Sequence, residues 1–138
     1  MEPVKKLKIL MLEDMESDAG LIEWTLRKAN IDFDCIRVDT REEYIDGLNN
    51  YHPDVVLSDH SLPQFNSREA YKICKAQNLQ VPFILVTGAV SEEFAVSCLK
   101  DGIDDYILKD NLTRLPVAIK NSLKQRKLEQ LKTMQKEH

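Results

Sequence analysis

Short, unbroken apolar runs constrain the fold of this chain more than any other feature of its sequence. Three of them, rich in Val, Ile and Leu, occupy residues 9–12, 54–57 and 82–86. Runs of this length and composition are typical of strands whose two faces are both buried. Two weaker runs, at residues 33–38 and 106–108, complete a set of five expected strands.

Segments of helical length separate the expected strands, and several begin with a helix-start signal. Thr40 is followed by Glu43, and Asn66 by Glu69, at the spacing of a capping box. Ser91 precedes two glutamates, which favour the first turn of a helix. Strands that alternate with helices predict an α/β fold, with a five-stranded parallel sheet, helices on both faces and a doubly wound arrangement. The 138 residues suit one such domain.

A long final helix is expected to begin near Leu112 and to run past Leu131, with Pro116 within its first turn. Beyond Leu123 charged residues dominate, so this part of the helix should project into solvent. We expect a domain at residues 5–123 and a basic helical extension at residues 124–138, which could link the domain to a removed one. Apolar residues at helical spacing predict a stripe that faces the sheet, formed by Leu112, Leu115, Ile119 and Leu123.

Charge is unevenly distributed along the chain. Residues 1–108 contain 11 Lys or Arg and 20 Asp or Glu, a net charge of −9, whereas residues 109–138 contain 8 and 3, a net charge of +5. Lysines and arginines interspersed along a helix favour a solvated face over a nucleic-acid site. We therefore expect no direct binding of nucleic acid.

The N-terminal segment and the cysteines indicate the compartment of the protein. The apolar run at residues 9–12 is too short for a signal peptide or a membrane span, and we expect a cytoplasmic protein. Cys35, Cys74 and Cys98 are odd in number and far apart, which argues against a disulfide framework or a zinc site. We expect three reduced, mostly buried thiols.

Chemically active side chains follow the expected strands, where the apolar runs end. Glu13 and Asp14 follow the first run, Asp59 the third, Thr87 the fourth and Lys109 the fifth. In an open parallel sheet ligands bind outside these carboxyl ends. Three carboxylates brought together repel one another, and a hard divalent cation such as Mg²⁺ makes the arrangement tolerable. Each acid alone could also be an ordinary strand-end cap or turn residue.

Taken in chain order, the strand ends form a set of motifs that resembles the receiver domain of two-component response regulators. The resemblance covers residues 5–123 and implies a (βα)5 flavodoxin-like fold. It also implies a signalling protein with no enzyme activity beyond self-catalysed phosphoryl transfer and autodephosphorylation. The motifs are Leu12-Glu13-Asp14, Leu57-Ser58-Asp59 followed by Leu62-Pro63, Val86-Thr87-Gly88, and Asp104-Asp105-Tyr106-Ile107-Leu108-Lys109.

The same resemblance implies roles for the acidic residues. Asp59 would accept a phosphoryl group from a phosphohistidine of a sensor histidine kinase or a histidine phosphotransfer protein. Asp14 and Asp59 would ligate Mg²⁺ or Mn²⁺, with Glu13 helping through water. The backbone carbonyl of Ser61 would be the remaining protein ligand.

Three further residues would contact the phosphate and form the switch. Lys109 would offset charge on the phosphoryl oxygens. Thr87 would donate its hydroxyl to a phosphate oxygen and draw its loop inward, which leaves room for Tyr106 to rotate toward the interior. We expect His60 to be a rim residue and not a phosphate relay, because side chains of adjacent strand-end residues point apart.

Two of the departures from the family pattern bear on the backbone. Ser67 follows Asn66 where many receivers have Gly, so a positive φ would have to be carried by Asn66 or be absent. Asp110 follows Lys109 where family members usually have Pro. Because a non-proline cis peptide costs about 3 kcal/mol, we predict a trans bond there.

Two other functions are compatible with the sequence. An unphosphorylated, receiver-like interaction module would act through its final helix. A magnesium-dependent phosphohydrolase would also form a phosphoaspartate, but Ser61 occupies the place of its general acid, two residues after Asp59. The sequence does not specify the kinase, the output or the oligomeric state, and a homodimer is among the options.

Overall fold

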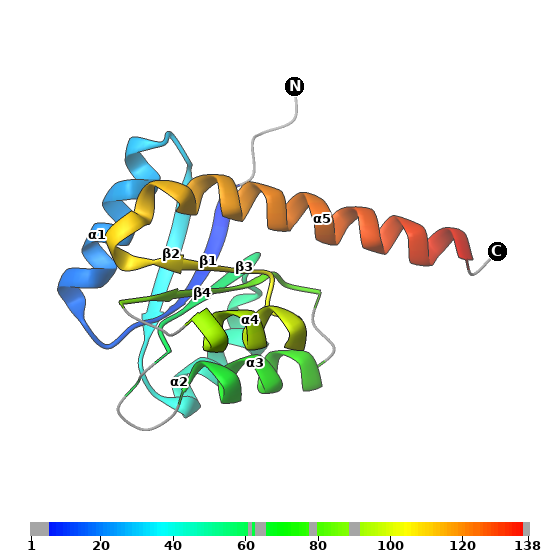
Figure 1. The fold of residues 1–138 in the computed structure, drawn as a ribbon, viewed down its shortest axis with the longest axis horizontal. Coiled ribbons are helices and arrows are strands. Elements are labelled where there is room, and N and C mark those ends of the chain that lie inside the picture. The colour runs from blue at the N-terminus through cyan, green and yellow to red at the C-terminus, as the bar shows by residue number, and fades with distance from the viewer. Residues whose placement is uncertain (1–5, 61, 63–65, 78–79, 89–91, 137–138) are drawn as a thin grey trace.

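The sheet has the doubly wound α/β topology that the sequence predicts. The computed structural model describes residues 6–60, 62, 66–77, 80–88 and 92–136, and in this part of the chain five parallel strands pair in the order β2-β1-β3-β4-β5 (Figure 1). Each expected strand is present. The strands are β1 (Leu7–Leu12), β2 (Phe33–Val38), β3 (Val55–Ser58), β4 (Phe83–Thr87) and β5 (Asp105–Leu108).

Helices cover both faces of the sheet. One face carries α1 (Glu16–Lys28) and α5 (Leu115–Lys136), and the other carries α2 (Arg41–Asp46), α3 (Ser67–Ala76) and α4 (Glu92–Asp101) (Figure 1). A π-helix, η1 (Gly47–Tyr51), directly follows α2, and a 3-10 helix, η2 (Lys109–Arg114), precedes α5.

Two of the predicted helix starts are confirmed. The side chain of Thr40 accepts a hydrogen bond from the amide of Glu43 at 3.2 Å, and that of Asn66 accepts one from Glu69 at 3.1 Å. Each bond satisfies an amide that has no partner within its helix. Asn66 has an extended backbone with φ −132°, so the positive φ considered for it is absent. Ser91, the third predicted start, lies outside the described residues.

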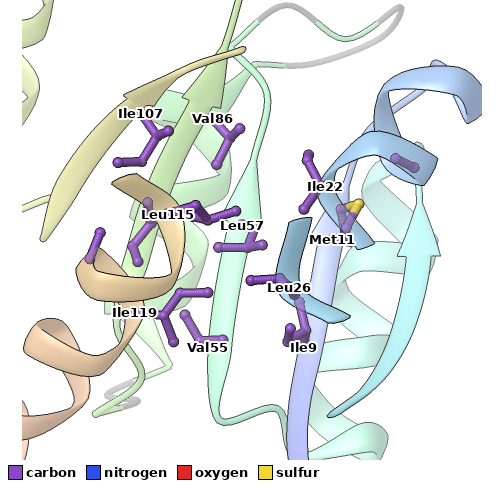
Figure 2. Close-up of a cluster of buried hydrophobic side chains, with 13 residues drawn as sticks. Ile9, Met11, Ile22, Leu26, Val55, Leu57, Val86, Ile107, Leu115 and Ile119 are labelled. Atoms are coloured by element: carbon purple, nitrogen blue, oxygen red, sulfur yellow. The ribbon is translucent and has the colours of Figure 1, made fainter. Parts of the chain in front are cut away.

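Strand β1 is buried on both faces, which explains why its apolar run is unbroken. Ile9 and Met11 lie in the core beneath α1 and α5, shown in Figure 2, whereas Leu10 and Leu12 lie in a second core beneath α2, α3 and α4. All four side chains are almost fully buried. A strand covered on both faces cannot alternate apolar with polar residues, because neither face meets water.

The start of α5 differs from the prediction. The α-helix begins at Leu115, and the segment before it forms η2, in which Asn111 departs from helical geometry with φ −138° and ψ 54°. Pro116 lies in the first turn of α5, where its missing amide hydrogen costs little. The predicted apolar stripe is confirmed, since Leu115 and Ile119 are buried and Leu112 and Leu123 pack against them.

The far half of α5 projects from the domain, as predicted (Figure 1). An ion pair of Arg126, here called the anchor of α5, attaches the start of this projecting half to the domain. Nε and Nη2 of Arg126 donate to the two carboxylate oxygens of Asp104, both at 2.9 Å, and Asp104 also accepts the amide of Phe83 at 2.9 Å. Beyond this ion pair Leu128 and Leu131 are 45% and 47% exposed.

The thiols agree with the prediction from the sequence. Cys35, Cys74 and Cys98 are free; Cys74 and Cys98 are buried and Cys35 is half-buried. Burial raises the pKa of Cys74 to about 11 and that of Cys35 to about 12, so both stay protonated near neutral pH. Within the described residues, every helix is too short or too polar to span a membrane.

Candidate functional site

The chemically active residues meet at the edge of the sheet formed by the carboxyl ends of its strands, here called the carboxyl edge. Glu13 follows β1, Asp59 follows β3, Thr87 ends β4 and Lys109 follows β5. Since β1, β3, β4 and β5 are neighbours in the sheet, their ends are adjacent in space. The sequence prediction that these four side chains converge is confirmed by their contacts.

Asp59 lies at the centre of the site. Its Oδ1 accepts hydrogen bonds from the Thr87 hydroxyl at 2.9 Å and from the amide of His60 at 2.7 Å, and its Oδ2 accepts one from Lys109 Nζ at 3.1 Å. The side chain is only 11% exposed. Three donors therefore orient a carboxylate that is still accessible from solvent.

Lys109 connects the carboxylates. Its Nζ lies 3.1 Å from Asp59, 2.9 Å from Glu13 Oε2 and 2.7 Å from Asp18. Burial lowers the pKa of Lys109, but the hydrogen bonds to Asp18, Glu13 and Asp59 outweigh that effect and raise the pKa above its ordinary value. The ammonium is therefore charged throughout the physiological range.

Asp18 is the member of this network that sequence reasoning missed. It lies in the first turn of α1, where an acidic residue already has a local explanation in the helix dipole. Helical side chains tilt toward the N-terminus of their helix, and here that direction leads back to the carboxyl edge. The available signal was that the first turn of α1 starts right after the acidic pair Glu13 and Asp14.

Glu13 is a buried acid whose carboxylate is paired with the ammonium of Lys109. It is 1% exposed, and its Oε1 accepts bonds from the amide of Met15 and from Lys109. Its Oε2 lies 2.9 Å from Lys109 Nζ, so the same ammonium contacts both oxygens of the Glu13 carboxylate. Burial, together with the charge of Asp59, raises the pKa of Glu13 to about 7, against the lowering effect of Lys109.

The donor set at the carboxyl edge fits a hard divalent cation. Glu13, Asp14 and Asp59 each offer a carboxylate oxygen, and these oxygens lie within 4.8 Å of one another. Oxygen ligands of this kind suit Mg²⁺ and Mn²⁺. These three carboxylates outnumber the single ammonium of Lys109, so negative charge remains for a cation to offset. The carbonyl of Ser61, the remaining predicted ligand, lies outside the described residues.

Tyr106 and His60 lie at the margins of the site. Tyr106 is half-buried on β5 and packs against the core beneath α2, α3 and α4. The ring of His60 lies 4.2 Å from that of Phe94, centroid to centroid, and its Nδ1 is 2.9 Å from the hydroxyl of Ser67. The His60 ring thus contacts α3 and α4, in keeping with the predicted rim position. The described chain contains no cis peptide, so the Lys109–Asp110 bond is trans, as predicted.

A doubly wound parallel sheet with an acidic cluster, a hydroxyl and a lysine at its carboxyl edge defines a response-regulator type of α/β protein. The response regulator receiver domain model matches residues 9–120, and the chain belongs to this family of two-component signalling modules.

Relatives with known roles are regulators that extend well beyond this chain. The regulatory protein LuxO of Vibrio vulnificus is 32% identical over 115 residues, which are 83% of this chain and 25% of LuxO. The alkaline phosphatase synthesis transcriptional regulatory protein PhoP of Bacillus subtilis is 30% identical over 102 residues, which are 74% of this chain and 42% of PhoP. The chain therefore spans less than half the length of these relatives.

Solved receiver structures share the fold. The signal receiver domain of a LuxO repressor protein from Vibrio parahaemolyticus superposes with a TM-score of 0.81 at 24% identity, covering 92% of this chain and 97% of that one. A CheY-like receiver protein from Methanospirillum hungatei gives a TM-score of 0.75 at 26% identity, covering 91% and 99%. These similarities confirm the predicted fold class.

Proposed function

We propose that this chain is a phosphoacceptor switch in which Asp59 receives the phosphoryl group. The observation that carries the proposal is the contact set of the Asp59 carboxylate, which meets Thr87 at one oxygen and Lys109 at the other. The donor would be a phosphohistidine of a sensor histidine kinase or of a histidine phosphotransfer protein, as is general for receiver domains.

The transfer step needs little chemistry from the protein beyond positioning and charge. An oxygen of Asp59 forms a bond to phosphorus while the bond from phosphorus to the donor imidazole breaks, and the imidazole keeps that electron pair. Lys109 is placed to offset charge on the phosphoryl oxygens. Glu13, Asp14 and Asp59 would hold Mg²⁺ or Mn²⁺, with the Ser61 carbonyl as a further ligand. Such an ion, when bound, supplies positive charge near the phosphoryl oxygens.

The switch would follow from the hydrogen bond that Thr87 now makes. The Thr87 hydroxyl donates to Asp59 Oδ1 in this structure. After phosphorylation it would donate to a phosphate oxygen and move its loop, and Tyr106 would rotate toward the interior. The half-buried position of Tyr106 at the margin of a core supports this proposal.

Further proposals concern the setting of the domain. We infer a cytoplasmic protein that binds no nucleic acid directly. Residues 124–138 would connect the domain to another part of a larger protein, because α5 continues as a helix past its anchor at Arg126. A homodimer through the same domain is one arrangement in which the switch could act.

The test is the intact mass of the protein after incubation with acetyl phosphate, with and without Mg²⁺. We expect a gain of one phosphoryl group that requires Mg²⁺ and is lost in Asp59→Asn. Asp110→Asn is the matched control, because it removes an exposed carboxylate next to Lys109 and should be phosphorylated like the wild type.

Two results would contradict the proposal. The first is an unchanged mass with both acetyl phosphate and a phosphorylated histidine phosphotransfer protein, which would favour an unphosphorylated interaction module. The second is sustained turnover of p-nitrophenyl phosphate, which would favour a phosphohydrolase.

A further inference from the structure

The ammonium group of Lys109 has three N–H donors and three carboxylate partners. Asp18, Glu13 and Asp59 all lie within hydrogen-bond distance of Nζ. A lysine ammonium can satisfy three acceptors at once. The position of Nζ in this structure is therefore determined by all three carboxylates together.

Asp18 differs from the other two partners in three respects. Its contact is the shortest of the three, at 2.7 Å. It belongs to α1, whereas Glu13 and Asp59 follow strands. Among the described residues, the carboxylates close enough to share one cation are Glu13, Asp14 and Asp59, and Asp18 is not in that group.

These differences matter once a divalent cation is bound. Glu13 and Asp59 would then direct oxygens to the cation, and their hydrogen bonds to Lys109 would weaken. The cation would also repel the ammonium, since like charges a few ångströms apart in a partly buried site interact strongly. Asp18 is the one partner of Lys109 that the cation would leave free.

We propose that Asp18 is a positioning residue that holds the Lys109 ammonium beside Asp59 while a divalent cation occupies the acidic cluster. The inference rests on the proposed phosphoacceptor function, and it adds a residue from α1 to the machinery at the carboxyl edge. Asp18 acts through Lys109 and has no contact with the phosphoryl group.

The first test separates cation binding from phosphoryl transfer. In Asp18→Asn we expect the rate of phosphorylation by acetyl phosphate at saturating Mg²⁺ to fall about tenfold, the size of one charge-assisted hydrogen bond lost in the transition state. The dissociation constant for Mg²⁺, measured by isothermal titration calorimetry, should change less than about threefold, because Asp18 supplies no oxygen to the cation cluster and its charge is already offset by Lys109.

Two further variants make this result specific. Asp18→Glu keeps the carboxylate on a longer side chain and should recover part of the rate. Glu16→Gln removes an exposed carboxylate from the same turn of α1 and should behave like the wild type. A rate in Asp18→Asn equal to or above that of the wild type would overturn the inference, as would an equal loss of rate and of Mg²⁺ affinity.

The second test observes Lys109 directly and needs no phosphorylation. Lysine ammonium groups give resolved ¹⁵N signals when hydrogen bonds slow their proton exchange, and Lys109→Met identifies the signal of Lys109. With Mg²⁺ bound, this signal should persist in the wild type and in Glu16→Gln and disappear in Asp18→Asn. Persistence in Asp18→Asn would overturn the positioning role.

The two tests also separate this inference from the proposed function. If the wild type takes up no phosphoryl group, the phosphoacceptor function fails, while the ammonium signal still decides whether Asp18 holds Lys109. If the wild type is phosphorylated and Asp18→Asn matches it, the inference about Asp18 alone is wrong.

Discussion

The two edges of the sheet carry ion pairs that differ in their balance of charge. At the carboxyl edge one ammonium, that of Lys109, faces the carboxyl groups of Glu13, Asp18 and Asp59, and Asp14 adds a further carboxyl group nearby. At the opposite edge, here called the amino edge, one guanidinium meets one carboxylate in the pair of Arg126 and Asp104. The side chains of Lys109 and Asp59 are 17% and 11% exposed, and those of Arg126 and Asp104 are 21% and 11% exposed.

The difference in charge balance explains why one edge only stabilises the fold, whereas the other is suited to bind a cation. At the amino edge each oxygen of Asp104 has a donor, and the charges of the pair cancel. A bound ion would therefore not stabilise this pair further. At the carboxyl edge one ammonium faces several carboxyl groups, so negative charge is in excess. That edge is destabilised as it stands, and a bound cation would relieve it.

The largest expected effect is at the amino edge. Asp104→Ala should lower the free energy of unfolding by about 3 kcal/mol, because it leaves the partly buried guanidinium of Arg126 without its partner. Urea unfolding followed by circular dichroism measures the change. The double variant Asp104→Ala with Arg126→Leu should recover part of the loss, and a loss below about 1 kcal/mol in the single variant would contradict the contrast between the edges.

Mg²⁺ should act on the carboxyl edge alone. At a concentration one hundred times its dissociation constant, Mg²⁺ should raise the free energy of unfolding by about 2.7 kcal/mol, provided that it binds only the folded chain. Asp14→Asn should remove most of this increase, whereas Asp104→Ala should keep it. The same urea titrations decide, and equal Mg²⁺ effects in both variants would argue against a cation site at Glu13, Asp14 and Asp59.

Neutralising Glu13 should stabilise the protein without metal. Burial raises the pKa of Glu13 to about 7, so its contribution to stability is present below its unfolded pKa and is lost as the pH rises through about 7. In the presence of EDTA at pH 8, Glu13→Gln should be more stable than the wild type by about 1 to 2 kcal/mol. The advantage should vanish near pH 5, and a less stable variant at pH 8 would contradict it.

The smallest effect is expected beyond the anchor of α5. Leu128→Ala should change the free energy of unfolding by less than about 0.5 kcal/mol, because Leu128 is nearly half exposed on the projecting helix. Thermal unfolding of the isolated chain measures it. A larger loss would show that the helix past Arg126 packs against something in solution.

Most of the fold could be predicted from local patterns. The strands were found because buried parallel strands keep apolar residues on both faces, as Leu10 and Met11 show in β1. The starts of α2 and α3 were found because Thr40 and Asn66 bond to amides three residues later. The start of α5 was wrong by three residues, because nothing in the sequence marked η2 as separate from the helix that follows it.

The site could be predicted only where strand topology brings residues together. Asp59, Thr87 and Lys109 end neighbouring strands, so their meeting follows from the sheet, although their proposed roles stay predictions. Asp18 and the pair of Arg126 with Asp104 depend on how helices pack, which no local pattern encodes. Arg126 in particular belongs to a basic segment that we expected to be solvated.

The anchored, projecting α5 has a mechanical consequence. From Arg126 to Lys136 the helix extends by about 15 Å at 1.5 Å per residue. Treated as a rigid lever with its fulcrum at the ion pair, it would turn a tilt of about 10° into a displacement of roughly 3 Å at its tip. A rearrangement that leaves every strand paired could thus move the tip of α5 by about the diameter of an atom.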